Sequence, residues 1–245
     1  MASESTTLYD IPGVGTFNTL LHADFTQLSS LPEALQIGTS TVAASGSPYA
    51  RQFRQDNVFI NNGSSISLVV PGRQTASPIS SARISTIYED ILYGSVRTVA
   101  KVAPTPGSCH GFFFYRDDNQ ESDIEILTSR QGRVYFTNQA VSPSSRNTST
   151  FTSLPANSTT EFHEYRLDWT PGKTAFYIDG VLAQTFTDNV PSRPGSWRWN
   201  NWSNGGSWSS GPPVHTSNLE IREITAYFNR TSIEAVTPVA NRSTT

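Results

Sequence analysis

The sequence predicts an all-β sandwich built as one large domain. The chain has 245 residues, of which 36% are hydrophobic and only 15% are charged. Its abundant Ser, Thr, Asn and Gly favour strands and turns over long helices, because β-branched side chains fit a pleated sheet while Gly and Asn fit turns. Short apolar runs separated by turn residues recur along the chain, and this spacing is typical of a sandwich.

The clearest local signal is the dipeptide Asp179-Gly180 between two apolar runs. It predicts a hairpin, because both central residues of such a turn need positive φ. Residues 162–169 alternate apolar and polar side chains, as in a half-buried strand, and His163 is interpreted there as a structural histidine. The expected strands are 65–70, 95–102, 111–115, 122–127, 133–138, 161–169, 174–178, 182–186 and 219–228.

Charge and composition exclude several classes of protein. The net charge is −3 and no basic run occurs, so no nucleic-acid partner is expected. No apolar stretch approaches about 18 residues, so no membrane span is expected. The four histidines lack metal-ligand spacing, and no Gly-rich phosphate loop is present, so neither a metal nor a cofactor is expected. Cys109 is the only cysteine, which excludes an internal disulfide and predicts a buried or semi-buried free thiol.

Asn-x-Ser/Thr triplets favour a secreted, extracellular or cell-wall protein. No signal peptide is visible after Met1, so we expect any such peptide to lie ahead of it. The triplets begin at Asn62, Asn147, Asn157, Asn201, Asn229 and Asn241.

The candidate catalytic residues are Glu121, Asp123 and Glu125. On a strand, positions i, i+2 and i+4 point to one face, while the residues between them point to the other. A retaining glycosidase needs two carboxyl groups roughly 5–5.5 Å apart. The two Glu Cα atoms would be about 13 Å apart, a gap that two Glu side chains leaning together close in large part. A solvated acidic strand face is the alternative interpretation.

Four further segments accompany the acidic run along the chain: Tyr93-Gly94-Ser95-Val96-Arg97, Gly111-Phe112-Phe113-Phe114-Tyr115, His163-Glu164-Tyr165-Arg166-Leu167-Asp168-Trp169-Thr170-Pro171-Gly172, and Tyr177-Ile178-Asp179-Gly180. Together with the acidic run they resemble glycoside hydrolase family 16, in the order expected for that family and over roughly residues 16–230. The family includes lichenases, laminarinases, xyloglucan transglycosylases and fungal chitin–glucan transglycosylases.

The resemblance implies a β-jelly-roll sandwich, concanavalin A-like, of two curved antiparallel sheets with a concave substrate cleft. It implies Glu121 as nucleophile, Asp123 as its helper and Glu125 as acid/base. Ser122 departs from the aliphatic residue usual in the family, and on the core face its hydroxyl needs a partner. The domain organisation expected is an irregular segment 1–15, a catalytic domain 16–230 and a flexible tail 231–245.

Candidate substrate-binding residues surround this motif. Four of the five tryptophans lie within residues 197–208. Alternation places Trp197 and Trp199 on one face of the strand and Asn200 and Trp202 on the other. Similarity to the family's Asn-x-Trp pattern implies that Asn200 and Trp202 face the substrate. Sugar rings bind to aromatic platforms flanked by amides and charges. The candidates are Tyr115, Asn138, Gln139, Asn200, Trp202, Trp208 and, more weakly, Arg83.

The expected function is that of a retaining endo-β-glucanase, acting as a monomer on a β-1,3- or mixed β-1,3/1,4-glucan polysaccharide or oligosaccharide. A cell-wall β-glucan or chitin–glucan transglycosylase is one alternative, and a non-catalytic, lectin-like sugar-binding module is another. Linkage preference is expected to depend on cleft loops 142–160 and 192–211. Asn201 lies on the proposed cleft strand and is expected to carry no glycan.

Overall fold

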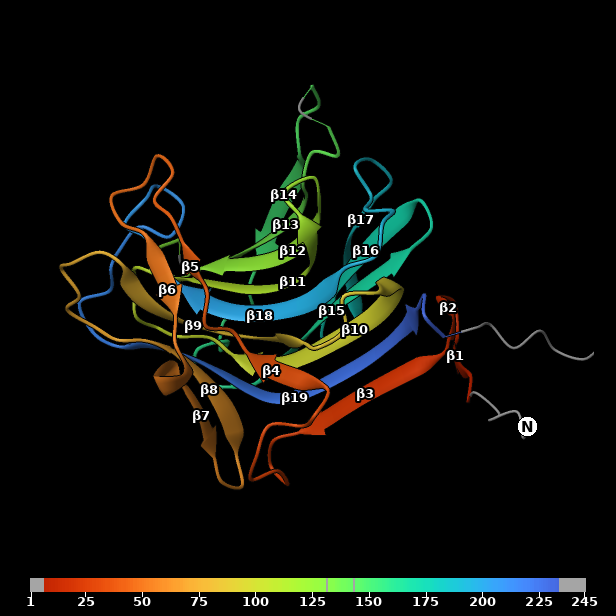
Figure 1. Cartoon of the computed structure of the whole chain (residues 1–245), viewed down its shortest axis with the longest axis horizontal. Coiled ribbons are helices and arrows are strands. Elements are labelled where there is room, and N and C mark those ends of the chain that lie inside the picture. Colours follow the sequence, from red (N-terminus) through yellow and green to blue (C-terminus); the bar gives the residue numbers. More distant parts are fainter. Residues whose placement is uncertain (1–6, 131, 143, 234–245) are drawn as a thin grey trace, which may run out of the picture.

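The computed structural model describes residues 7–130, 132–142 and 144–233, and this part of the chain forms two large stacked β-sheets. Figure 1 shows the sheets as curved layers, with β11, β12 and β18 in one layer and β10 and β19 in the other. The sandwich expected from the apolar spacing is confirmed.

The first layer, called the cleft sheet below, has the strand order β14-β13-β12-β11-β18-β9-β6-β5, with β4 paired to β9. Neighbouring strands are antiparallel, except that β6 runs parallel to β9. Its strands are β4 (Leu35–Ile37), β5 (Thr41–Val42), β6 (Arg51–Phe53), β9 (Ile79–Thr86), β11 (Cys109–Asp117), β12 (Gln120–Leu127), β13 (Arg133–Asn138), β14 (Thr148–Ser153) and β18 (Ser196–Trp202).

The second layer, the outer sheet, has the order β17-β16-β15-β10-β19-β8-β7, with β3 paired to β19. The predicted hairpin joins β16 to β17, and its turn residues Asp179 and Gly180 have φ of 49° and 75°. The strands are β3 (Thr19–Asp24), β7 (Val58–Asn61), β8 (Ser65–Val70), β10 (Ile91–Lys101), β15 (His163–Thr170), β16 (Lys173–Ile178), β17 (Val181–Phe186) and β19 (Ser217–Arg230).

Two local expectations need correction. Within segment 1–15, expected to be irregular, β1 (Tyr9–Ile11) pairs with β2 (Gly15–Phe17) in a small hairpin, because Gly13 adopts φ of 76° in the turn. Loop 142–160 contains β14, whereas β18, within 192–211, is the cleft strand expected around Asn201. A single 3₁₀ turn, η1 (Gln55–Asn57), is the helical element of the described chain. Within those same ranges, no helix has the length and apolar character that crossing a membrane requires. Most of the tail 231–245 lies outside the described residues.

Alternation along the central strands supplies the core. Phe112 and Phe114 of β11 pack against the outer sheet, with ring centroids 5.6 Å from Tyr165 and 4.0 Å from Trp169 respectively. Trp197 and Trp199 are buried in the same core. Since successive residues on a strand face opposite sides, burying these rings turns the intervening residues of β11, β12 and β18 to the other face of the cleft sheet.

Candidate active site

The three acids lie on β12 and share its outward face. Residues Ile124 and Ile126 between and beyond them are buried in the core, as the alternation predicted. On β11, Tyr115 lies opposite Glu121 and Gly111 lies opposite Glu125. The strand pairing therefore sets the acids at the middle of the cleft sheet, with β11 and β18 on one side and β13 and β14 on the other.

All three acids line one hollow of about 210 Å³ in the cleft sheet. Six strands contribute to its wall: β5, β6, β9, β11, β12 and β18. A small hollow that brings acids together with aromatic rings, an amide and arginines has the composition of a sugar-binding site. Its lining residues are Val42, Arg51, Phe53, Arg83, Phe113, Tyr115, Asp118, Glu121, Asp123, Glu125, Arg198, Asn200 and Trp202.

Glu121 and Asp123 form a coupled pair. Burial raises the pKa of Glu121, and a hydrogen bond with the Asp123 carboxyl lowers it again. Burial also raises the pKa of Asp123, and the charges of Glu121 and Glu125 raise it further. Gln139 Nε2 donates to Asp123 Oδ2 at 3.1 Å. Asp123 therefore holds its proton more tightly than Glu121 does, and Glu121 is the carboxyl of the pair that ionises first.

Glu125 has different surroundings. Burial raises its pKa, while hydrogen bonds from Cys109 and Trp208 and the charge of Arg51 lower it. Cys109 Sγ lies 3.2 Å from Glu125 Oε1, and Trp208 Nε1 lies 3.1 Å from Oε2. Both carboxyl oxygens thus have a donor. Unequal environments for two nearby carboxyls are what acid and nucleophile roles require.

Asn200 reaches the acids across a glycine. Gly111 lies between Asn200 on β18 and Glu125 on β12 in the strand register. A Cβ at Gly111 would lie 2.7 Å from Asn200 Oδ1, so the glycine leaves room for the amide. Asn200 Oδ1 is buried without a hydrogen-bond partner among the described residues, as expected for a group that accepts a bond from a ligand.

Arginines stack on the aromatic rings of the hollow. The guanidinium of Arg198 lies 4.0 Å from the ring centroid of Tyr115, and that of Arg51 lies 4.1 Å from Trp202. Arg83, the weakest candidate, is a lining residue and lies 4.5 Å from the centroid of Phe53. Stacking holds each side chain in place and leaves guanidinium N–H groups for hydroxyls.

The prediction that Asn138 binds substrate is wrong, because its side chain does not face the hollow. It is fully buried, and its cross-strand partner is Ser122 on the core face. Asn138 Oδ1 accepts from Ser122 Oγ at 2.8 Å, and Nδ2 donates to Thr174 Oγ1 at 2.9 Å and to the Asp188 carbonyl at 3.0 Å. The pleat places neighbours on opposite faces, so Gln139 next to it contacts the acids while Asn138 joins the two sheets. Asn138 is therefore the hydrogen-bond partner that the buried Ser122 hydroxyl was expected to need.

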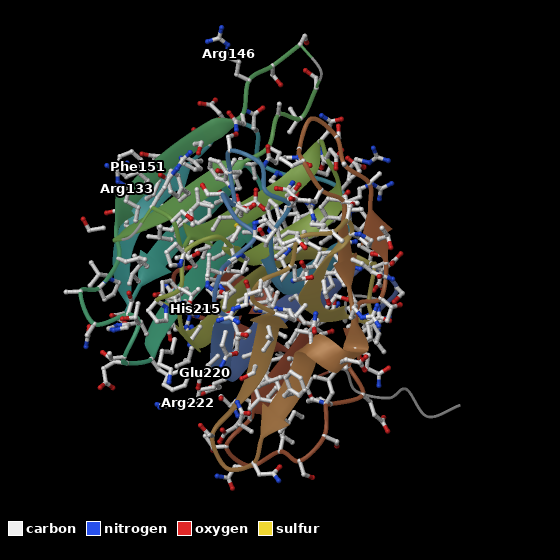
Figure 2. All side chains as sticks on the ribbon, turned by 90° about the vertical axis from the view of Figure 1, so that its left-hand side faces the viewer. Arg133, Arg146, Phe151, His215, Glu220 and Arg222 are labelled. Atoms are coloured by element: carbon white, nitrogen blue, oxygen red, sulfur yellow. The ribbon has the colours of Figure 1, made fainter. Side chains whose placement is uncertain are left out.

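An aromatic row continues the site beyond Glu125. Tyr135 on β13 lies opposite Glu125, and Phe151 on β14 lies opposite Tyr135. The Tyr135 ring centroid lies 5.2 Å from that of Trp208 and 5.5 Å from that of Phe151. Phe151 is 51% exposed, and Figure 2 shows it beside Arg133 at the edge of the sheet.

Several residues of the site escaped sequence reasoning. Arg198, Phe113 and Cys109 could have been found, because they alternate in phase with Asn200 and Tyr115 on their strands. Arg51 could not, because β6 reaches the hollow through a long-range parallel pairing with β9. Asn201, the doubtful glycan acceptor, is fully buried and donates to the carbonyls of Leu68 and Ser217.

Metal binding has no support in the described part of the chain, where no cluster of three or more His, Cys, Asp or Glu side chains is arranged to hold an ion.

The family model for "Glycosyl hydrolases family 16" matches residues 45–218, which include every strand that lines the hollow apart from the two residues of β5. Among curated proteins, a beta-glucanase of Paenibacillus polymyxa is 34% identical over 126 residues, which are 47% of this chain and 51% of the relative. Congo red hypersensitive protein 1 of Saccharomyces cerevisiae is 30% identical over 111 residues, 42% of this chain and 21% of the relative. The chain thus spans about half or less of the length of these relatives.

Solved structures agree on the fold. A lichenase from a mouse hindgut metagenome aligns with a TM-score of 0.72 at 20% identity, covering 86% of this chain and 99% of that one. An endo-beta-1,3-glucanase from Pyrococcus furiosus aligns with a TM-score of 0.72 at 17% identity, covering 91% and 98%. At these identities the likeness shows the sandwich fold alone, and it confirms the jelly-roll expected.

Proposed function

The chain belongs to glycosyl hydrolases family 16, and from this premise we propose that it is a retaining endo-β-glucanase acting on β-1,3- or mixed β-1,3/1,4-glucan. The observation that carries the proposal is the row of three acids in one hollow, with Glu121 paired to Asp123 and Glu125 held by separate donors. Beta-glucanases among the relatives support the substrate class.

The proposed reaction is a double displacement. Glu125 donates its proton to the departing glycosidic oxygen, while the Glu121 carboxylate attacks the anomeric carbon and forms a covalent glycosyl-enzyme. Glu125, now ionised, takes a proton from water, whose oxygen displaces Glu121 from the sugar. Asp123 keeps its proton and donates to Glu121, which orients the nucleophile and stabilises it when it leaves.

Replacing Glu121 with Gln tests this mechanism. The amide cannot attack the anomeric carbon, so release of reducing ends from barley β-glucan, lichenan and laminarin should fall by at least about 1,000-fold. The melting temperature and glucan binding should be retained. Activity within ten-fold of the wild type would overturn the assignment. Binding of glucan by a wild-type protein that releases no reducing ends would instead support a lectin-like module.

The aromatic row favours a second candidate, a cell-wall transglycosylase. Trp208, Tyr135 and Phe151 lie on the Glu125 side, where the departing sugar leaves and a new acceptor enters. Aromatic faces bind sugar rings, so this row can hold an acceptor long enough to compete with water. The match to Congo red hypersensitive protein 1 makes a fungal cell-wall context a reasonable one to test.

Phe151→Ala separates the two candidates. Phe151 is half exposed, so its truncation should leave stability nearly unchanged. If the row binds acceptors, elongation of a fluorescent glucan oligosaccharide should fall by about five-fold or more, while cleavage of the donor changes less than two-fold. Phe59→Ala, at a half-exposed phenylalanine on β7 of the outer sheet, is the matched control. Shortened products alone, in wild type and variant alike, would leave hydrolysis as the activity.

We also propose that the protein is a secreted, glycosylated monomer. The side chains of Asn62, Asn147 and Asn157 are exposed, which supports them as glycan acceptors. A mobility shift on treatment with an amidase that removes N-glycans, after expression in a eukaryotic secreting host, tests this.

A further inference from the structure

The buried thiol of Cys109 touches the carboxyl proposed as acid/base. We propose that Cys109 is a positioning residue for Glu125: its S–H donates to Oε1 and so assigns the transferable proton to Oε2. This inference rests on the proposed function of Glu125. The contact is direct, with Sγ 3.2 Å from Oε1. Among the residues that the structure describes, the thiol has one other acceptor, the His110 carbonyl, at 3.8 Å.

The strand register explains why a small residue with a donor sits here. Cys109 is two residues before Gly111, the cross-strand partner of Glu125, so it is a diagonal neighbour of the carboxyl on the same face. The thiol is fully buried in an apolar cluster. The Glu125 carboxyl is the nearer of its two acceptors, at 3.2 Å against 3.8 Å for the His110 carbonyl. The cluster comprises Phe53, Cys109, Leu127, Tyr135 and Trp202.

The donor cannot become a competing charge. Burial raises the pKa of Cys109 well above its ordinary value, and the nearby charge of Glu125 raises it further. The sulfur therefore keeps its proton throughout the reaction. In the first step, the proton on Glu125 Oε2 passes to the departing glycosidic oxygen. In the second step, Oε2 takes a proton from the incoming hydroxyl, while the S–H bond stabilises the carboxylate through Oε1.

Cys109 and Trp208, which both donate hydrogen bonds to Glu125, belong to different parts of the fold. Cys109 belongs to β11, at the middle of the cleft sheet, whereas Trp208 belongs to the connection between β18 and β19. Trp208 Nε1 donates to Oε2, the oxygen to which we assign the transferable proton, and Cys109 Sγ donates to Oε1. The thiol bond can therefore persist through the whole cycle.

Other charged and titratable groups also face Glu125, and they are the same in every variant used below. Arg51 of β6 lowers the pKa of Glu125. Tyr135 of β13 is its cross-strand partner, and Arg130 donates to the Tyr135 hydroxyl at 3.4 Å. Asp123 and Glu121 lie along β12 itself. A change that follows the replacement of Cys109 alone therefore reports the thiol.

The test compares Cys109→Ala, which removes the donor, with Cys109→Ser, which retains one. The alkaline limb of the pH profile of kcat/KM reports the acid of the free enzyme. A lost bond to the carboxylate raises the pKa of Glu125, so in the Ala variant this limb should move upward by roughly half to one pH unit. In the Ser variant it should stay within about 0.2 unit of the wild type. Leu127→Val, in the same cluster, should lower the melting temperature without moving the limb.

A second readout does not need turnover. The ¹³C shift of the Glu125 carboxyl, followed by pH titration, should show the same order, with the Ala variant titrating at higher pH than wild type and Ser. Equal shifts in the Ala and Ser variants, or no shift in either, would overturn the positioning role. A wild-type protein inactive on all glucans would contradict the proposed function instead, while the titration would still decide whether the thiol acts on Glu125.

Discussion

At the scale of single residues, the site depends on a glycine, Gly111, as well as on its functional side chains. Gly111 lies between Asn200 and Glu125 on adjacent strands. A Cβ there would come within 2.7 Å of Asn200 Oδ1. Gly111 does not have a positive φ, so its backbone conformation does not require glycine. The lack of a side chain is required because the Asn200 amide occupies the space where a Cβ would lie.

Gly111→Ala should displace Asn200 from the hollow. We expect kcat/KM on β-glucan to fall by about ten-fold, roughly 1.4 kcal/mol, since one amide contact to the sugar is lost. Asn200→Ala should show a similar loss. If Gly111 acts through Asn200, adding Gly111→Ala to the Asn200→Ala background should cost less than two-fold. Additive losses in the double variant would contradict this coupling.

At the scale of elements, the sequence predicted strands where apolar residues alternate and missed those where they do not. Arg133–Asn138 and Ser65–Val70 match their predictions residue for residue. By contrast, β14 consists of Thr, Ser and a single phenylalanine, so its pattern resembles a polar loop. It becomes a strand because β13 offers it a hydrogen-bonding edge, which is tertiary information.

The same dependence on strand pairing explains which site residues could be predicted from the sequence and which could not. The acids, Tyr115, Asn200 and Trp202 could be predicted, because period two relates them to core residues that are easily recognised. Asn138 was wrong by a single position, and on a strand one position reverses the face. Alternation places Cys109 on the cleft face, but its contact with Glu125, like the position of Arg51 in the hollow, depends on which strands pair, and no local pattern encodes that.

Asn138→Ala tests the corrected assignment. The side chain joins β12, β13 and β16 through buried hydrogen bonds, so its loss should reduce the free energy of unfolding by roughly 3 kcal/mol. KM for β-glucan should change less than two-fold, because the side chain does not reach the hollow. Urea unfolding and initial rates measure the two effects. A raised KM with unchanged stability would restore the original prediction.

At the scale of the whole molecule, the acid row opposes folding. Burial raises the pKa of all three carboxyls, and for Glu121 it raises the value to about 8. A carboxyl whose pKa is higher in the folded state than in the unfolded one contributes stability below its unfolded pKa. That contribution is lost as the pH rises through the folded pKa. The fold should therefore weaken between about pH 5 and pH 8.

Asp123→Asn should reverse part of this loss. The amide keeps the size of the protonated acid and removes its charge, so at pH 8 the variant should be more stable than wild type by about 1 kcal/mol or more. At pH 4.5 the difference should be small. Thermal unfolding at both pH values measures it. Equal melting temperatures at pH 8 would show that the row carries no electrostatic strain.

The burial of Asn201 has a consequence for biosynthesis. A glycan can be attached to this asparagine only while the chain is still extended, because in the finished fold its amide donates to two carbonyls inside the sandwich. A chain that received a sugar there could not insert β18 between β9 and β11. In a cell that modifies such triplets during translocation, strand insertion and glycan transfer therefore compete for the same nitrogen. The yield of active protein should depend on which is faster.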